Sequence, residues 1–139
     1  CRKLELEPGM TLLDIGCGWG GFARYAATHA DCHVTGLTLS TEQLRFAQAR
    51  AQAAGVADRV SFELRDYRDV SAQYDHVVSI EMYEAVGEAY WPTYFAAIHD
   101  ALKPGGRAAI QAITIDDSTM SVFASGGSTT TRPRRPAAR

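Results

Sequence analysis

The sequence of 139 residues predicts an α/β fold, a doubly wound parallel sheet, and three observations support this prediction. Short apolar runs of the kind that form buried strands alternate with stretches whose apolar residues recur at helical spacing. A turn made almost entirely of glycine, from Gly16 to Gly21, separates the first apolar run from the first helical pattern. With 46% hydrophobic and 22% charged residues, the chain lies near the globular average and can bury one core.

The first half of the chain predicts two strands and two helices. The turn Pro8-Gly9 leads into a strand at about 11–15, and a helix at about 20–30 has apolar residues at Phe22, Tyr25 and Ala26. A strand at about 33–38 follows. Ser40 then opens a second helix with a capping box, in which Ser40 accepts from an N–H three residues on and Gln43 reaches back. Gly55 ends that helix.

The second half predicts three strands and one main helix. Strands are expected at about 59–64 and 75–80, followed by a helix at about 91–102 with apolar residues at helical spacing. The sequence Lys103-Pro104-Gly105-Gly106 stops this helix, and a fifth strand follows at about 107–113. Five strands linked by helices imply a parallel sheet with a ligand crevice at the carboxyl ends of its strands.

The chain is expected to have two parts, a folded core at 1–117 and a disordered basic tail at 118–139 rich in Ser, Thr, Pro and Arg. A tail that binds nucleic acid is one interpretation, and an incidental end of the coding frame is the other. Because the chain begins at Cys1, we expect a fragment, with the sheet truncated after about the fifth strand.

Composition argues against several classes of function. The net charge is −2 and the core is net acidic, so its surface is not expected to bind nucleic acid. The sequence has no run of eighteen apolar residues and no signal-like start, so neither a membrane span nor export is indicated. Three cysteines and four histidines show no metal-ligand spacing, and the odd number of cysteines suits a cytoplasmic location.

The glycine turn predicts a nucleotide-like cofactor, because glycine lets backbone N–H groups and a helix N-terminus approach a ligand. Gly16, Gly18 and Gly21 also fit the dinucleotide pattern G-x-G-x-x-G, but an NAD site needs an acid at the end of the second strand. That strand ends in Thr38-Leu39-Ser40. The acid lies instead at Asp14, where it either orients the loop or reaches a ligand amino group, and this arrangement favours S-adenosylmethionine. An NAD-linked oxidoreductase remains an alternative.

Four segments together resemble the cyclopropane-fatty-acyl-phospholipid synthase and mycolic acid cyclopropane synthase family of S-adenosylmethionine-dependent methyltransferases. They are Leu12 to Phe22 with its G-C-G-W-G-G, Thr35 to Leu44 with G-L-T-L-S, Ser79 to Gly87 with E-A-V-G, and Leu102 to Gly106. The resemblance covers about residues 4–117, which match the middle of a full-length member. It implies a Rossmann-like methyltransferase fold.

The resemblance also implies a set of cofactor contacts. Gly16, Gly18 and Gly20 would lie against the methionine portion, and Thr38, Leu39 and Gln43 would lie at the ribose. Asp66 would accept from the adenine amino group. Tyr67 would pack against the ring, with ordinary edge packing as the alternative, and Ile80 would be an apolar contact.

For chemistry, the resemblance implies that Glu84 helps to hold a bicarbonate ion beside the alkene of an unsaturated phospholipid acyl chain. The alkene attacks the sulfonium methyl group, and loss of a proton then gives a cyclopropane ring or a methylene branch. Gln111, two residues before Ile113, replaces the histidine that many members have in the last strand, and it would position the ion. Glu81 is the alternative acid. Aromatic faces stabilise cations, so the candidates for that role are Tyr83, Tyr90 and Trp91, with core packing as the alternative for Trp91.

The resemblance implies peripheral membrane contact in the intact parent. Two other functions stay open: a methyltransferase for another small molecule, and a cofactor-binding remnant without turnover. The resemblance does not decide between ring closure and a methyl or methylene branch.

Overall fold

The computed structural model describes residues 4–113 and shows five parallel strands in the order β3-β2-β1-β4-β5. The strands are β1 (Thr11–Ile15), β2 (His33–Thr38), β3 (Val60–Leu64), β4 (Tyr74–Ile80) and β5 (Leu102–Gln111). The main helices are α1 (Gly21–Ala30), α2 (Thr41–Ala53) and α4 (Trp91–Asp100). The predicted tail at 118–139 lies outside the described residues.

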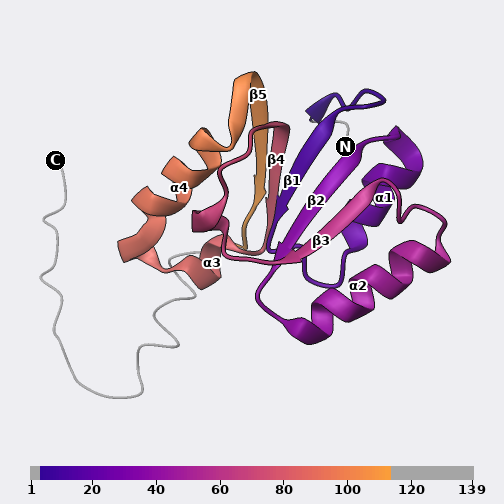
Figure 1. The fold of residues 1–139 in the computed structure, drawn as a ribbon. Helices are drawn as coiled ribbons and strands as arrows, with labels where there is room; N and C mark the ends of the chain where they lie inside the picture. The colour runs from indigo at the N-terminus through magenta and orange to yellow at the C-terminus, as the bar shows by residue number, and fades with distance from the viewer. Residues whose placement is uncertain (1–3, 114–139) are drawn as a thin grey trace, which may run out of the picture.

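Helices cover both faces of the sheet, as the predicted doubly wound fold requires. Figure 1 shows α1 and α2 on one side of the sheet and α3 (Tyr83–Val86) with α4 on the other. The strand order reverses between β1 and β4, which lie side by side with Leu13 opposite Val77. A crevice at the carboxyl ends of the strands is expected at such a reversal. The fold class is therefore confirmed.

Strand β1 supplies two cores, because successive side chains of a strand point to opposite faces. Leu12 packs with the small residues of α1, while Leu13 and Ile15 pack with Tyr94 and Ile98 of α4. The buried face of α1 consists of Ala23, Ala26 and Ala27. Their small size lets the helix approach the sheet closely, and this holds the glycine turn directly above the end of β1.

The boundary between the last helix and the last strand differs from the sequence prediction. The sequence predicts a helix to 102 and a strand from 107 to 113, but α4 ends at Asp100 and β5 runs from Leu102 to Gln111. Leu102 pairs with Tyr74 and Arg107 pairs with His76, so β5 contains an irregularity at Pro104-Gly105-Gly106. Pairing with β4 thus extends the strand through residues whose local sequence indicates a stop.

Three short helical segments go beyond the sequence prediction. They are η2 (Tyr67–Asp69) after β3, and α3 followed by η3 (Glu88–Tyr90) between β4 and α4. Each is too short to show helical periodicity. None of the helices in the described part of the chain is both long and apolar enough to cross a membrane.

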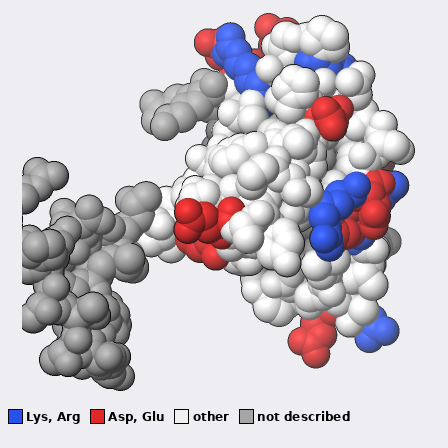
Figure 2. Space-filling view, turned by 90° about the vertical axis from the view of Figure 1, so that its left-hand side faces the viewer, with Lys and Arg blue, Asp and Glu red and all other residues white. Residues whose placement is uncertain are grey.

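Figure 2 views the molecule from the side of α3 and α4. A broad uncharged surface occupies the middle of this face (Figure 2). Lys and Arg lie beside Asp and Glu at the upper left and right edges, and acidic side chains without a basic neighbour lie at the left and upper right. This mixture differs from the continuous basic patch that is typical of nucleic-acid surfaces.

Candidate functional site

The glycine turn forms one wall of a cavity at the carboxyl ends of β1 and β2. Gly16 and Gly18 have φ angles of +74° and +53° and line the cavity. Leu37 O accepts from Cys17 N at 2.8 Å, so the loop is tied to the end of β2. A Cβ on Gly18 would meet nothing within 4 Å, which leaves open space beside its backbone. This turn therefore offers bare backbone to a ligand.

Gly20 has a different environment from Gly16 and Gly18. Its φ is +74°, and a Cβ there would lie 2.8 Å from both Ala47 Cβ and Phe62 Cζ. It is absent from the residues that line the cavity. The structure thus places Gly20 where α1, α2 and β3 pack together, although the family resemblance assigns it to the methionine portion of a cofactor.

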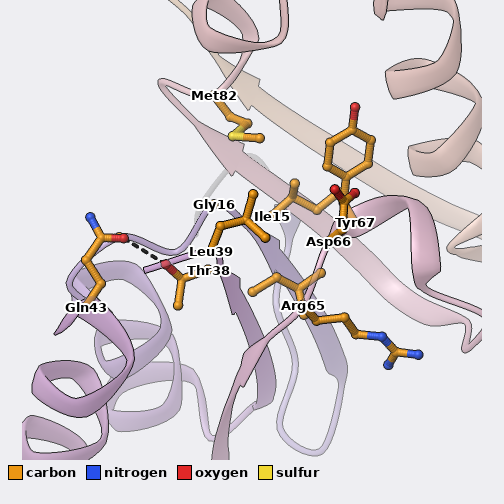
Figure 3. A pocket seen from close by; sticks show the side chains of 11 residues that line it. Ile15, Gly16, Thr38, Leu39, Gln43, Arg65, Asp66, Tyr67 and Met82 are labelled. Carbon is orange, nitrogen blue, oxygen red and sulfur yellow. Dashed lines mark hydrogen bonds between the residues drawn. The ribbon is translucent and has the colours of Figure 1, made fainter. Parts of the chain in front are cut away.

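Thr38 and Gln43 form a polar pair on the cavity wall. Thr38 Oγ1 donates to Gln43 Oε1 at 2.8 Å, and both residues line the cavity with Leu39 (Figure 3). Half of the predicted capping box is confirmed, since Ser40 Oγ accepts from Gln43 N at 3.2 Å. The other half is wrong: Ser40 N donates to Thr38 Oγ1 at 3.1 Å, so Gln43 does not reach back. The side chain of Gln43 instead turns toward the cavity.

Asp66 and Tyr67 lie after β3 on the same cavity. Asp66 Oδ1 accepts from Arg68 N at 2.9 Å and caps η2. The carboxylate also pairs with the Arg68 guanidinium at 2.6 Å, and this hydrogen bond lowers the pKa of Asp66 below its usual range. Tyr67 packs edge-on against Tyr94 with ring centroids 5.6 Å apart. Tyr67 therefore takes part in core packing and also lines the cavity.

The cavity has a volume of about 230 Å³ and brings together seven of the predicted cofactor residues: Gly16, Gly18, Thr38, Leu39, Gln43, Asp66 and Tyr67. Four further lining residues were missed by sequence reasoning: Ile15, Leu37, Arg65 and Met82. Ile15 and Leu37 are strand residues next to the predicted loops, so position along the strands could have indicated them. Met82 comes from the segment after β4, and nothing local in the sequence marks it.

Asp14 is buried beneath the loop and does not line the cavity. Burial raises the pKa of its carboxyl to about 7. Its Oδ2 atom has no hydrogen-bond partner among the described residues. Burial, together with the charge of Asp14, raises the pKa of Cys17 to about 12, so the Cys17 thiol stays protonated and is a packing residue.

The predicted chemical residues come together at the ends of β4 and β5. The Glu84 carboxylate accepts from Ile113 N, and this hydrogen bond lowers the pKa of Glu84. Gln111 O accepts from Glu81 N at 2.9 Å. Glu81 has a φ of +55°, a left-handed conformation that is uncommon outside glycine. The β4–α3 junction therefore adopts a sharp turn beside these groups.

The remaining candidates lie near this junction. Ile80 ends β4 opposite Gln111 and does not line the cavity. Tyr83 of α3 stacks on Trp91 with ring centroids 4.5 Å apart, while Tyr90 is exposed. Tyr83 and Trp91 thus each have one aromatic face covered by the other.

Comparison with known proteins identifies relatives over most of the chain. The family model for mycolic acid cyclopropane synthetase matches residues 1–130. Tuberculostearic acid methyltransferase UfaA1 of Mycobacterium tuberculosis is 50% identical over 115 residues, which cover 83% of this chain and 27% of the relative. Cyclopropane-fatty-acyl-phospholipid synthase of Escherichia coli is 48% identical over 106 residues, covering 76% of this chain and 27% of the relative. The chain thus spans about a quarter of the length of these proteins.

Solved structures agree with these sequence matches. The cyclopropane synthase MmaA2 from Mycobacterium tuberculosis has a TM-score of 0.79 and 34% identity, covering 92% of this chain and 45% of that one. Mycolic acid cyclopropane synthase CmaA1, complexed with SAH and CTAB, has a TM-score of 0.69 and 34% identity, covering 73% and 36%. The family match, the sequence identities and the shared fold together show that this chain belongs to the mycolic acid cyclopropane synthetase family.

Proposed function

We propose that this chain is the cofactor-binding part of an S-adenosylmethionine-dependent methyltransferase. Its parent methylates the double bond of an unsaturated acyl chain in phospholipid. The product is a cyclopropane or a methylene-branched acyl chain, and a saturated methyl branch would follow only after a separate reduction by an added hydride donor. The proposal depends on one observation: this chain, a member of the family, has a cavity in which Gly16 and Gly18 face the neutral Thr38–Gln43 pair.

The residues of this cavity fit S-adenosylmethionine. Gly16 and Gly18 have positive φ angles and leave room for the methionine portion against the backbone. The Gln43 amide oxygen accepts from Thr38, so its nitrogen is left to donate to a ribose hydroxyl oxygen. Asp66 and Tyr67 would hold the adenine. When bound, this cofactor supplies an electrophilic methyl group on a cationic sulfonium.

A nicotinamide dinucleotide fits the cavity less well. Its ribose hydroxyls call for an acidic side chain at the end of the second strand, where this chain has the Thr38–Gln43 pair. The acid nearest in sequence to the turn, Asp14, is buried beneath the loop and does not line the cavity. The related CmaA1, whose crystal structure is a complex with SAH, also supports the cofactor assignment.

The groups at the ends of β4 and β5 suit an anion that carries a proton. The Glu84 carboxylate would accept the O–H of a bicarbonate ion, while the side-chain amide of Gln111 would donate to one of its oxygens. When bound, bicarbonate supplies the base for the proton that leaves the methylated acyl chain. Glu84 is exposed and its pKa is lowered by the Ile113 N–H, so it stays ionised and acts as an acceptor.

The acyl substrate is proposed from the relatives. One relative is named cyclopropane-fatty-acyl-phospholipid synthase and another tuberculostearic acid methyltransferase. Both names describe chemistry on lipid or fatty acyl groups. Contact of the parent with a membrane surface follows as part of the same proposal, since the substrate is a phospholipid.

Two measurements test the proposal, the first on the 139-residue chain and the second on the intact parent. Calorimetric titration should show binding of S-adenosylhomocysteine and no binding of NADH. Methyl transfer from labelled S-adenosylmethionine should appear in vesicles of monounsaturated phospholipid and be absent with fully saturated phospholipid. Tight binding of NADH without binding of S-adenosylhomocysteine would refute the cofactor assignment.

Variants of the acidic residues sharpen the second measurement. Glu84→Gln should lower methyl transfer by about 100-fold, the lower end of a general acid–base contribution. Glu88→Gln, which changes a neighbouring exposed acid on η3, is the matched control and should transfer methyl groups normally. Binding of S-adenosylhomocysteine without any transfer would instead indicate a cofactor-binding remnant.

A further inference from the structure

Met82 occupies an unusual place in the site. It follows the left-handed residue Glu81 and is the N-cap of α3. Its backbone carbonyl accepts from Ala85 N at 3.0 Å and Val86 N at 3.2 Å. The backbone of Met82 therefore anchors the helix that carries Glu84.

The side chain of Met82 points the other way, into the cofactor cavity. Its Sδ lies 3.0 Å from the position that a Cβ on Gly16 would take, so the thioether rests on the glycine turn. Figure 3 shows Met82 on the opposite side of Gly16 from Thr38 and Gln43. Met82 thus lies at the end of the cavity that the ribose pair does not occupy.

We propose that Met82 is a positioning residue that holds the methyl-bearing end of the donor against Gly16, beside the segment that carries Glu84. This inference rests on the proposed function. A single short segment, Met82 to Glu84, both lines the donor cavity and carries the carboxylate that meets Ile113 N. This segment therefore connects the donor cavity to the Glu84 site.

Methionine suits this place for physical reasons. Its side chain is unbranched and apolar, so it excludes water without competing for the hydrogen bonds of the donor. Its sulfur is polarisable, which favours contact with a cationic group. A side chain at position 16 would begin 3.0 Å from the Met82 sulfur and would push Met82 aside, so Gly16 and Met82 together set the width of this end of the cavity.

The test compares two ligands that differ only at the end near Met82. S-Adenosylhomocysteine carries the homocysteine portion, whereas adenosine has no amino-acid portion and reaches only the Thr38–Gln43 and Asp66 end. Calorimetric titration of Met82→Ala should show S-adenosylhomocysteine binding about ten-fold weaker than for the wild-type chain, equivalent to ~1.4 kcal/mol. Adenosine affinity should change less than about two-fold, and Met82→Leu should behave like wild type for both ligands.

Met10→Ala is the matched control, because Met10 is a half-buried methionine that packs on the α1 side of the sheet. It should leave the ratio of the two affinities unchanged. If Met82→Ala fails to fold, Met82→Gln keeps the length of the side chain, adds a polar amide and should lower the same ratio.

The outcomes separate this inference from the proposed function. Equal weakening of both ligands, or no change in either, would overturn the role of Met82 while leaving the cofactor assignment intact. Failure of the wild-type chain to bind either ligand would overturn the cofactor assignment and the inference with it.

Discussion

Replacing Gly20 by alanine should destabilise the fold more than the same change at Gly18. Both residues have positive φ, at +74° and +53°, so each substitution incurs the left-handed backbone cost of about 1–2 kcal/mol. At Gly20 the new Cβ would also lie 2.8 Å from Ala47 Cβ and from Phe62 Cζ. These separations are at least ~0.7 Å shorter than an optimal carbon–carbon contact. Forcing extra carbon into a packed core adds about 1–3 kcal/mol.

The two variants therefore differ in magnitude. Gly20→Ala should lower the free energy of unfolding by about 2–5 kcal/mol, a large part of the 5–15 kcal/mol typical of a domain. Gly18→Ala should lower it by about 1–2 kcal/mol, because its Cβ would enter open space. Urea unfolding followed by circular dichroism measures both values, and an unchanged dependence on urea concentration would show that the denatured state is unaffected.

Ligand binding should show the opposite order. Gly18 lines the cavity, so its new methyl group should weaken binding of S-adenosylhomocysteine, whereas folded Gly20→Ala protein should bind nearly as the wild type does. Equal destabilisation by the two substitutions would refute the argument that Gly20 is required for packing. Loss of S-adenosylhomocysteine binding in Gly20→Ala alone would show that Gly20 contacts the ligand.

Three other perturbations have defined outcomes. Burial raises the pKa of Asp14 from about 3.9 in the unfolded chain to about 7. The contribution of the protonated Asp14 carboxyl to the free energy of unfolding is therefore present at low pH and is lost as the pH rises toward 7. Between about pH 4 and 7, the wild-type free energy of unfolding should fall relative to that of Asp14→Asn by up to ~1.4 kcal/mol per pH unit. Parallel curves of unfolding free energy against pH for the two proteins would contradict this. Gln43→Ala removes the hydrogen-bond partner of Thr38 and should weaken adenosine binding, measured by calorimetry, by about ten-fold. The free energy of unfolding should change by less than ~1 kcal/mol. An unaltered adenosine affinity would show that the ribose binds elsewhere. Asp75 accepts from Thr11 N and pairs with Lys103, which lowers its pKa, so Asp75→Asn should cost about 1 kcal/mol in thermal or urea unfolding at pH 7. This cost should shrink as the pH falls below about 4, and a cost independent of pH would show that the charge of Asp75 is unimportant.

Local sequence was enough to predict the elements whose signals lie within a few residues. The Ser40 cap, the glycine turn and the Thr38–Gln43 segment are all contiguous or nearly so, and the structure places Thr38 and Gln43 together on the cavity. The resemblance to a family brought together Glu84, Gln111 and Ile113 across 29 positions, and the structure places Glu84 against Ile113 N. Periodicity alone would not have linked them.

The sequence by itself thus determined the fold class, the glycine turn and most of the cavity wall, because strand and helix periods and a glycine turn are local properties of the chain. Tertiary structure alone decided the rest. Gly20 looks locally like Gly16 and Gly18, but its neighbours Ala47 and Phe62 come from α2 and β3. Met82 reaches Gly16 from 66 positions away because β4 lies beside β1 in the sheet. Which backbone faces a ligand and which faces a packed side chain depends on how the strands are ordered, and strand order is a property of the whole sheet.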